Sequence, residues 1–221
     1  MKQNQYILIL LTVLMISIGK GNQVKAIRSR PVNDTDKLNM AIEYFQSGKY
    51  HEALLLFNQL DQEYNLNTRY RAYIGVCYYH EWEYDKASLY LDSVISKLSV
   101  FAPHEQAVYY YTNAESHFNL KEYKEAIPCY EQMLNVCYDN EKGDVFYRLG
   151  FCYMFENDWN NAHGYFNSAL SYYQRFGFQS KIKPRLAQIQ NMIKGCKEHI
   201  EIVTDSVIMS DSTILIVTKE Q

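Results

Sequence analysis

The sequence predicts an all-α superhelical solenoid of four helix-turn-helix repeats, followed by a C-terminal capping helix and a short β-prone tail. One observation is an aromatic residue placed three positions before an alanine, a motif that occurs four times and ends at Ala53, Ala87, Ala126 and Ala162. These alanines are 34, 39 and 36 residues apart, a period typical of stacked helical repeats. A second observation is the composition: 48% of the 221 residues are hydrophobic, with only four prolines, which suits a packed helical chain.

Each repeat is interpreted as two antiparallel helices. Twelve residues before each alanine stands a small residue, and these are Ala41, Gly75, Ala114 and Gly150. Three positions later comes a ring, and four positions after the alanine comes a large side chain: Phe57, Leu91, Tyr130 or Phe166. Offsets of three and four place residues on one helix face. The small residues therefore let two helix axes approach, and the large side chains fill the space around them.

This pattern resembles the tetratricopeptide repeat family, which has a small residue, a ring, an alanine and a large apolar residue at the same offsets. The resemblance covers residues 34–67, 68–101, 107–140 and 143–176. The chain departs from the family pattern at the first aromatic position, which holds Lys37, Arg71, Tyr110 and Phe146. The closing proline of the family is replaced by Asn65, Ser99, Tyr138 and Gln174. The resemblance implies a protein-binding repeat fold.

The N-terminal segment is typical of a secretory signal peptide. Lys2 precedes an uncharged apolar run over residues 6–18, and small residues follow. We expect a signal peptide within residues 1–26, cleaved after residue 19 or 26, and a linker up to residue 33. The run is shorter than the ~20 residues of a membrane-spanning helix, so the prediction is a periplasmic or secreted protein without membrane insertion after cleavage. The alternative is an uncleaved inner-membrane anchor with the chain facing the periplasm.

Charge and motifs argue against several functional classes. The net charge is −3 and no basic stripe occurs, which argues against nucleic-acid binding. The three His-Glu pairs at 51–52, 80–81 and 104–105 lack the second histidine, four positions on, that a zinc protease needs. No two cysteines stand two to four residues apart, and no P-loop or G-x-S-x-G motif occurs. We predict no enzymatic activity, no catalytic residues, no metal and no cofactor.

The five cysteines do not form a predictable disulfide framework. They are Cys77, Cys129, Cys137, Cys152 and Cys196. An odd count leaves at least one free thiol, and most are expected to be small buried apolar residues. A bond between Cys129 and Cys152 on neighbouring helices is conceivable from the sequence.

The family resemblance implies where a partner would bind, because the first helix of each repeat lines the concave side of such a stack. The predicted groove residues are Phe45, Arg69, Tyr73, Tyr79, His80, Tyr111, Glu115, Phe118, Asn119, Tyr147, Arg148, Phe151, Met154 and Phe155. Rings with polar tips are frequent anchors at protein interfaces, and such a groove suits a peptide or helical segment. Leu38 and Ile42 occupy the positions where some family members carry a carboxylate clamp, so that subtype is not expected.

These features predict a non-catalytic protein–protein interaction scaffold with a protein or peptide partner. The alternative is a membrane-anchored sensor or envelope-assembly subunit that keeps its N-terminal anchor. Residues 180–201 are expected to form the capping helix, with Pro184 in its first turn and an apolar stripe that includes Ile189 and Cys196. Residues 202–221 are rich in β-branched side chains, which favours one or two short strands or a disordered tail.

Overall fold

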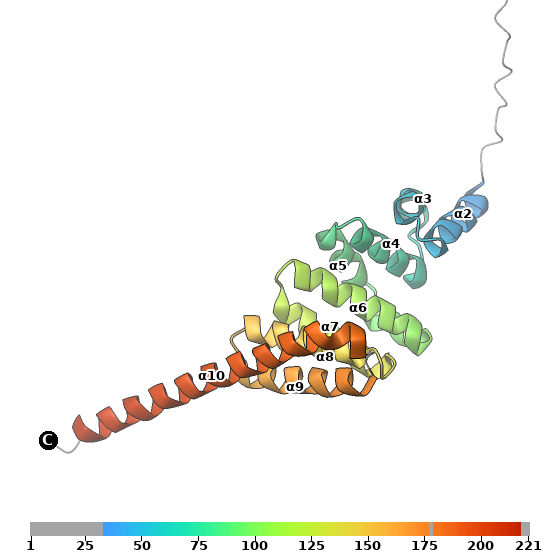
Figure 1. Ribbon diagram of the computed structural model, residues 1–221. Helices are drawn as coiled ribbons and strands as arrows, with labels where there is room; N and C mark the ends of the chain where they lie inside the picture. The colour runs from blue at the N-terminus through green and yellow to red at the C-terminus, as the bar shows by residue number, and fades with distance from the viewer. Residues whose placement is uncertain (1–32, 177–178, 218–221) are drawn as a thin grey trace, which may run out of the picture. The chain divides into compact units, whose positions relative to one another are not determined.

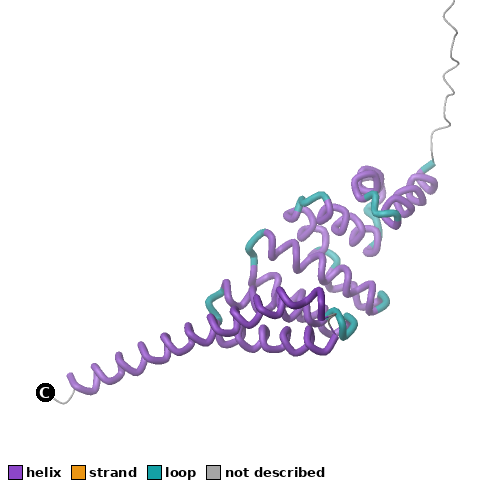
Figure 2. The backbone as a smooth tube through the Cα atoms, viewed as in Figure 1, coloured by secondary structure: helices purple, strands orange, loops and turns teal. Residues whose placement is uncertain are grey.

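Helices joined by short turns make up the described part of the protein (Figure 1). The computed structural model describes residues 33–176 and 179–217, and within these ranges it contains helices, turns and loops but no strand (Figure 2). The helices from α2 to α10 belong to one unit that begins at Asp34. The predicted signal peptide and its cleavage sites lie outside the described residues.

The helices pack in consecutive antiparallel pairs. The pairs are α2 (Asp34–Gln46) with α3 (Tyr50–Tyr64), α4 (Thr68–His80) with α5 (Tyr84–Asp92), α6 (Pro103–Asn119) with α7 (Tyr123–Val136), and α8 (Lys142–Phe155) with α9 (Trp159–Phe176). Each second helix also contacts the first helix of the next pair. The predicted all-α stack of four helix-turn-helix units is therefore confirmed.

A left-handed residue ends the first helix of every pair. The residue five positions before each repeat alanine has a positive φ, and these residues are Gly48, Trp82, Lys121 and Asn157. The backbone N–H of the next residue then donates to a carbonyl in the last turn of the helix, as Lys49 does to Tyr44 at 2.8 Å. This arrangement satisfies carbonyls that the helix end would leave unpaired. Only the first of the four positions is glycine. At the other three a side chain makes the left-handed backbone conformation less favourable.

The repeat positions identified in the sequence form the core. The four repeat alanines and the large residues Phe57, Leu91, Tyr130 and Phe166 are all fully buried. A Cβ added at Gly75 would lie 2.6 Å from Leu91 Cγ, and one at Gly150 would lie 2.6 Å from the Phe166 ring. Because real Cβ atoms do not approach so closely, glycine sets the spacing of the second and fourth pairs.

A short 3-10 helix fills the longer connection between the second and third pairs. This element, η1 (Ile95–Val100), buries Leu98 completely. The Phe101 ring that follows it meets Tyr109 edge to face, with ring centroids 6.0 Å apart. The additional residues of this connection are therefore packed against α6.

The predicted capping helix is present as the first part of α10 (Gln179–Val217), which packs against α9. Ile189 and Cys196 are buried in a cluster with Phe166 and Ala169, so the predicted apolar stripe covers the end of the stack. The expected position of Pro184 in the first turn is wrong. The helix begins at Gln179, which leaves Pro184 inside it.

The expectation of strands in the tail is wrong for residues 202–217, because α10 continues to Val217 (Figure 1). No proline or glycine interrupts residues 196–217, so each further residue extends an existing helix at little cost. A strand would require a pairing edge, and the described residues offer none. Residues 218–221 lie outside the described part of the chain. No helix in the described part is long and apolar enough to cross a membrane.

All five cysteines are unpaired, and four of them are buried. The conceivable bond between Cys129 and Cys152 is not formed. Burial raises the pKa of Cys77 and Cys152 to about 12 and that of Cys129 to about 11. These thiols remain protonated at neutral pH and act as small packing residues.

Candidate partner-binding groove

A cavity of about 980 Å³ opens along α6 and α8 and is bordered by α10. We call it the α6–α8 groove. Its lining residues are His104, Ala107, Val108, Tyr111, Phe118, Asn119, Lys121, Tyr123, Met133, Glu141, Asp144, Val145, Tyr147, Arg148, Phe151, Phe155, Arg185 and Gln188. The groove has the volume of sites that hold ligands of drug or peptide size.

Helix geometry explains why these side chains share one surface. On α6 the lining residue Tyr111 stands four positions after Ala107 and three after Val108, which is the spacing of one helix face. On α8 the residues Tyr147, Phe151 and Phe155 repeat at intervals of four. The two helices are the first helices of neighbouring pairs, and they present equivalent faces to the groove.

Aromatic rings form one end of the groove. Tyr123 and Phe155 stack with ring centroids 4.7 Å apart, and Phe118 meets Tyr123 edge to face at 5.4 Å. Phe151 lies 5.9 Å from Phe155. Phe155 is 46% exposed, so the ring is held by its neighbours while one side stays open to solvent. Such fixed rings lose little conformational entropy when they bind a partner.

A buried ion pair supports the floor of the groove. Arg148 Nη2 donates to Glu115 Oε2 at 2.7 Å, and the Tyr130 hydroxyl donates to Glu115 Oε1 at 2.5 Å. Glu115 is only 2% exposed, so these donors compensate a carboxylate removed from water. Burial and the Glu115 charge raise the pKa of Tyr130 above its usual range. The Arg148 guanidinium also lies 4.7 Å from the centre of the Phe118 ring, which fixes its position.

Half of the predicted groove residues line this cavity: Tyr111, Phe118, Asn119, Tyr147, Arg148, Phe151 and Phe155. Glu115, also predicted, is buried beneath the groove, where it holds Arg148. The remaining six do not line the cavity, and they are Phe45, Arg69, Tyr73, Tyr79, His80 and Met154.

Contacts within the protein occupy several of these six residues. Phe45 stacks on Tyr73 with ring centroids 4.1 Å apart, which joins α2 to α4. His80 stacks on Tyr50 at 3.8 Å. Arg69 donates two hydrogen bonds to the Glu105 carboxylate, at 3.0 and 3.2 Å. These contacts engage Phe45, His80 and Arg69 within the protein, and the cavity lies along the third and fourth pairs and the cap.

Some groove residues lie outside the first helices and were not expected from the sequence. Lys121 belongs to the left-handed turn after α6, a position that the repeat spacing could have revealed. Arg185 and Gln188 come from α10. The Arg185 guanidinium lies 4.2 Å from the centre of the Tyr147 ring, a contact that depends on how the cap packs and has no signal in the repeat pattern.

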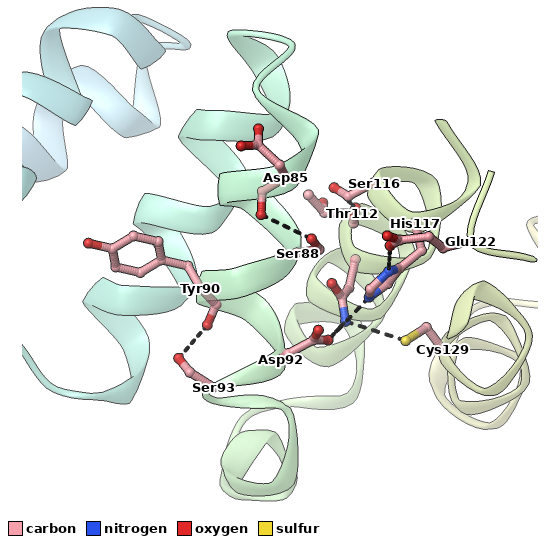
Figure 3. A network of polar contacts seen from close by, with 11 residues as sticks. Asp85, Ser88, Tyr90, Asp92, Ser93, Thr112, Ser116, His117, Glu122 and Cys129 are labelled. Carbon is pink, nitrogen blue, oxygen red and sulfur yellow. Dashed lines mark hydrogen bonds and ion pairs between the residues drawn. The ribbon is translucent and has the colours of Figure 1, made fainter. Parts of the chain in front are cut away.

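A second polar cluster joins the second and third pairs (Figure 3). His117 is 6% exposed, and its two ring nitrogens face two carboxylates: Nδ1 lies 2.8 Å from Glu122 Oε2, and Nε2 lies 3.3 Å from Asp92 Oδ1. Asn113 Nδ2 also donates to Asp92 Oδ1, at 2.7 Å, and to Cys129 Sγ, at 3.4 Å. Only the imidazolium can donate to both carboxylates, because a neutral ring has one N–H.

The pKa of His117 reflects these contacts. Burial alone would lower the pKa, but the hydrogen bonds to Asp92 and Glu122 and their negative charge outweigh burial and raise it. The pKa of Asp92 is lowered, because bonds from His117 and Asn113 outweigh the opposing effect of its burial. No set of three or more His, Cys, Asp or Glu residues in the described chain is arranged to hold a metal ion. The hydrogen bonds from Asn113 and His117 to Asp92 join α6 to α5.

A family model supports the repeat fold. The tetratricopeptide repeat model matches residues 144–175, which correspond to α8 and α9. Over these residues the chain is similar to the tetratricopeptide repeat family. No curated protein sequence matches it.

Solved structures of MamA share the fold. A MamA structure labelled AMB-1 is 15% identical, with a TM-score of 0.61, over 76% of this chain and 82% of that one. A second MamA structure is 16% identical, with a TM-score of 0.52, over 76% of this chain and 92% of that one. MamA from Desulfovibrio magneticus RS-1 is 18% identical, with a TM-score of 0.51, over 79% of this chain and 96% of that one. At these identities the likeness shows the fold alone.

Proposed function

We propose that this protein is a non-catalytic interaction scaffold of the tetratricopeptide repeat type, which binds a peptide or helical segment of a partner protein in the α6–α8 groove. The groove itself carries the proposal. It is a cavity of about 980 Å³ walled by fixed rings, and it is built on the first helices of two neighbouring pairs. Concave apolar surfaces with a few fixed polar groups are the usual form of a binding site.

The chemistry of the groove favours binding over catalysis. Its histidine, His104, stacks on Tyr138 with ring centroids 5.0 Å apart. The carboxylate nearest its floor, Glu115, is neutralised by Arg148. A nucleophile paired with a base, which covalent catalysis would require, is not assembled among the lining residues.

We propose in addition that the protein is exported, on the strength of the N-terminal apolar run and the small residues that follow it. The N-terminal residue of the mature protein tests this proposal. Lys20 or Ile27 at the N-terminus supports a free periplasmic or secreted scaffold. An intact Met1 in the envelope fraction contradicts cleavage and supports the anchored alternative.

Affinity capture with a matched pair of variants tests the scaffold function. Tyr111→Lys and Phe151→Lys together place two charges in the groove. The control changes Leu55 and Leu89 to lysine, since both are exposed on second helices and neither lines the groove. Circular dichroism first checks that both double variants keep the wild-type helix content.

We expect a partner from the native extract to bind wild type and control and to be lost with the groove variant. Binding of the purified partner to each protein, measured by calorimetry, then gives the affinities directly. Retention of the partner by the groove variant with unchanged affinity would place the binding surface elsewhere and overturn the proposal.

A further inference from the structure

Two cations of the α6–α8 groove have no carboxylate partner within the described part of the chain. Lys121, Arg148 and Arg185 line the groove, and of these Arg148 is neutralised by buried Glu115. Among the residues that the structure describes, no carboxylate forms an ion pair with Lys121 or Arg185. The N–H groups of Lys121 and Arg185 are therefore not used in an ion pair within the described part of the chain.

The two carboxylates that line the groove are already engaged. Glu141 Oε2 accepts a hydrogen bond from the backbone N–H of Tyr138 at 2.9 Å. Asp144 accepts from the Tyr173 hydroxyl, which comes from α9. Both carboxylates lie at the N-terminal end of α8, whereas Lys121 follows the C-terminal end of α6. The donors are neutral, so both carboxylates keep their charge, but neither forms an ion pair with Lys121 or Arg185. The N–H groups of these two cations can therefore bind a carboxylate of a ligand.

Arg185 is positioned as a recognition group. Its guanidinium lies 4.2 Å from the centre of the Tyr147 ring, an arrangement that fixes the cation against an aromatic face. A guanidinium held on a ring still presents the N–H groups of its edge, which match a carboxylate in a bidentate manner. Arg148 lies over the Phe118 ring in the same way, but its Nη2 donates to Glu115 and its charge is paired there.

We propose that the partner segment is acidic as well as apolar, with Asp or Glu side chains next to the apolar residues that enter the aromatic end of the groove. This inference rests on the proposed scaffold function and specifies the chemistry of the partner. The carboxylates pair with Arg185 and Lys121, while apolar side chains contact Phe151 and Phe155. Charge complementarity of this kind adds specificity and speeds association.

The same charges argue against the N-terminal segment of this chain as the occupant. Residues 1–33 contain five cations and no carboxylate: Lys2, Lys20, Lys25, Arg28 and Arg30. A segment of this charge is repelled by Lys121 and Arg185, and it would leave both cations unmatched. The N-terminal segment therefore does not fit, and the occupant that we propose is an acidic segment of a partner protein.

Peptide display on the full-length chain tests the chemistry even though the partner is unidentified. The probe is a library of random twelve-residue peptides, selected on wild type and counter-selected on the Tyr111→Lys, Phe151→Lys variant to retain groove binders. We expect the retained peptides to be enriched in Asp and Glu beside Leu, Ile, Phe or Trp. Their binding should weaken as ionic strength rises, because exposed ion pairs are screened by salt.

A charge-reversal variant supplies the second measurement. Lys121→Glu with Arg185→Glu should weaken binding of an enriched peptide by about tenfold, which corresponds to about 1.4 kcal/mol. The control is Lys97→Glu with Lys183→Glu, which reverses the same number of charges at exposed positions outside the groove. The control should bind within about twofold of wild type, which is less than about 0.5 kcal/mol.

The outcomes separate this inference from the proposed function. Groove-dependent peptides without acidic enrichment, or with equal affinity for both charge variants, would overturn the acidic partner and leave the scaffold function intact. An absence of any peptide that depends on Tyr111 and Phe151 would overturn both. Enriched peptides that resemble residues 202–221 of this chain would also contradict binding of a separate partner and would point to self-association.

Discussion

The glycine at position 150 allows the sharpest test of how the repeats pack. Gly150 lies on α8 where it crosses α9, and a Cβ at this position would lie 2.6 Å from two atoms of the Phe166 ring and 2.9 Å from a third. Phe166 is fully buried, so its ring has little room to move. The change to test is Gly150→Ala.

Two opposing effects decide the result. An additional methylene in a well-packed core costs about 1–3 kcal/mol. Alanine in place of glycine inside a helix stabilises by about 1 kcal/mol. With three ring atoms closer than a Cβ tolerates, we expect the packing cost to exceed the gain and the free energy of unfolding to fall by about 1 kcal/mol.

Gly164→Ala is the matched control, because Gly164 lies on α9 of the same pair and a Cβ there would meet nothing within 4 Å. Alanine is more favourable than glycine inside a helix, and at this position it adds no clash. The free energy of unfolding should therefore rise by about 0.5–1 kcal/mol. Urea unfolding followed by circular dichroism measures both values, and an unchanged denaturant slope shows that stability alone has changed.

The alternative outcome is informative. In the first and third pairs the equivalent residues are Ala41 and Ala114, both fully buried, so those pairs accommodate a methyl group at this position. If Gly150→Ala proves as stable as Gly164→Ala, α8 and α9 can move apart to accommodate the methyl group, as the first and third pairs do. That result would refute the conclusion that glycine fixes the distance between these helices.

Buried groups give three further predictions. The stability that His117→Gln loses relative to wild type should be largest below pH 6.5, because folding raises the pKa of His117. The difference should decline as the pH rises through the pKa of His117 in the folded protein. A difference in urea unfolding that does not change with pH would contradict this prediction. Arg148→Met should lower the unfolding free energy by about 3 kcal/mol, because Glu115 is left buried without its cation; a loss below ~1 kcal/mol in the same assay would contradict the pairing. Ile189→Asp should unfold the cap and the last pair, seen as lost helix content by circular dichroism, whereas exposed Ile202→Asp should not; equal thermal stability of the two variants would refute the capping role.

Much of the fold could be predicted from the repeat register. Positions such as Ala87 and Phe57 recur at helical offsets, and the structure buries them completely. Periodicity predicts such contacts well because helix geometry is local and regular. The stripe that contains Ile189 identified the capping helix for the same reason.

The candidate site was predictable only in part. The sequence indicated that rings on first helices would face one side, and Phe151 and Phe155 do line a cavity. It could not show that Phe45 stacks on Tyr73, since that contact depends on the distance between two helices of different pairs. Glu115 has the right helical position for the groove, but the Arg148 and Tyr130 side chains draw its carboxylate into the interior.

The sequence by itself determined the class of the protein: four repeated helix pairs, a cap and an aromatic character on the first helices, because each follows from residue spacing along one helix. Tertiary structure alone decided which rings line the cavity, where Arg185 meets Tyr147, and that the tail continues α10 through residue 217. These features depend on side chains and helix ends brought together from distant parts of the chain. They are stabilised by contacts between helices, and the spacing of residues along one helix does not predict such contacts.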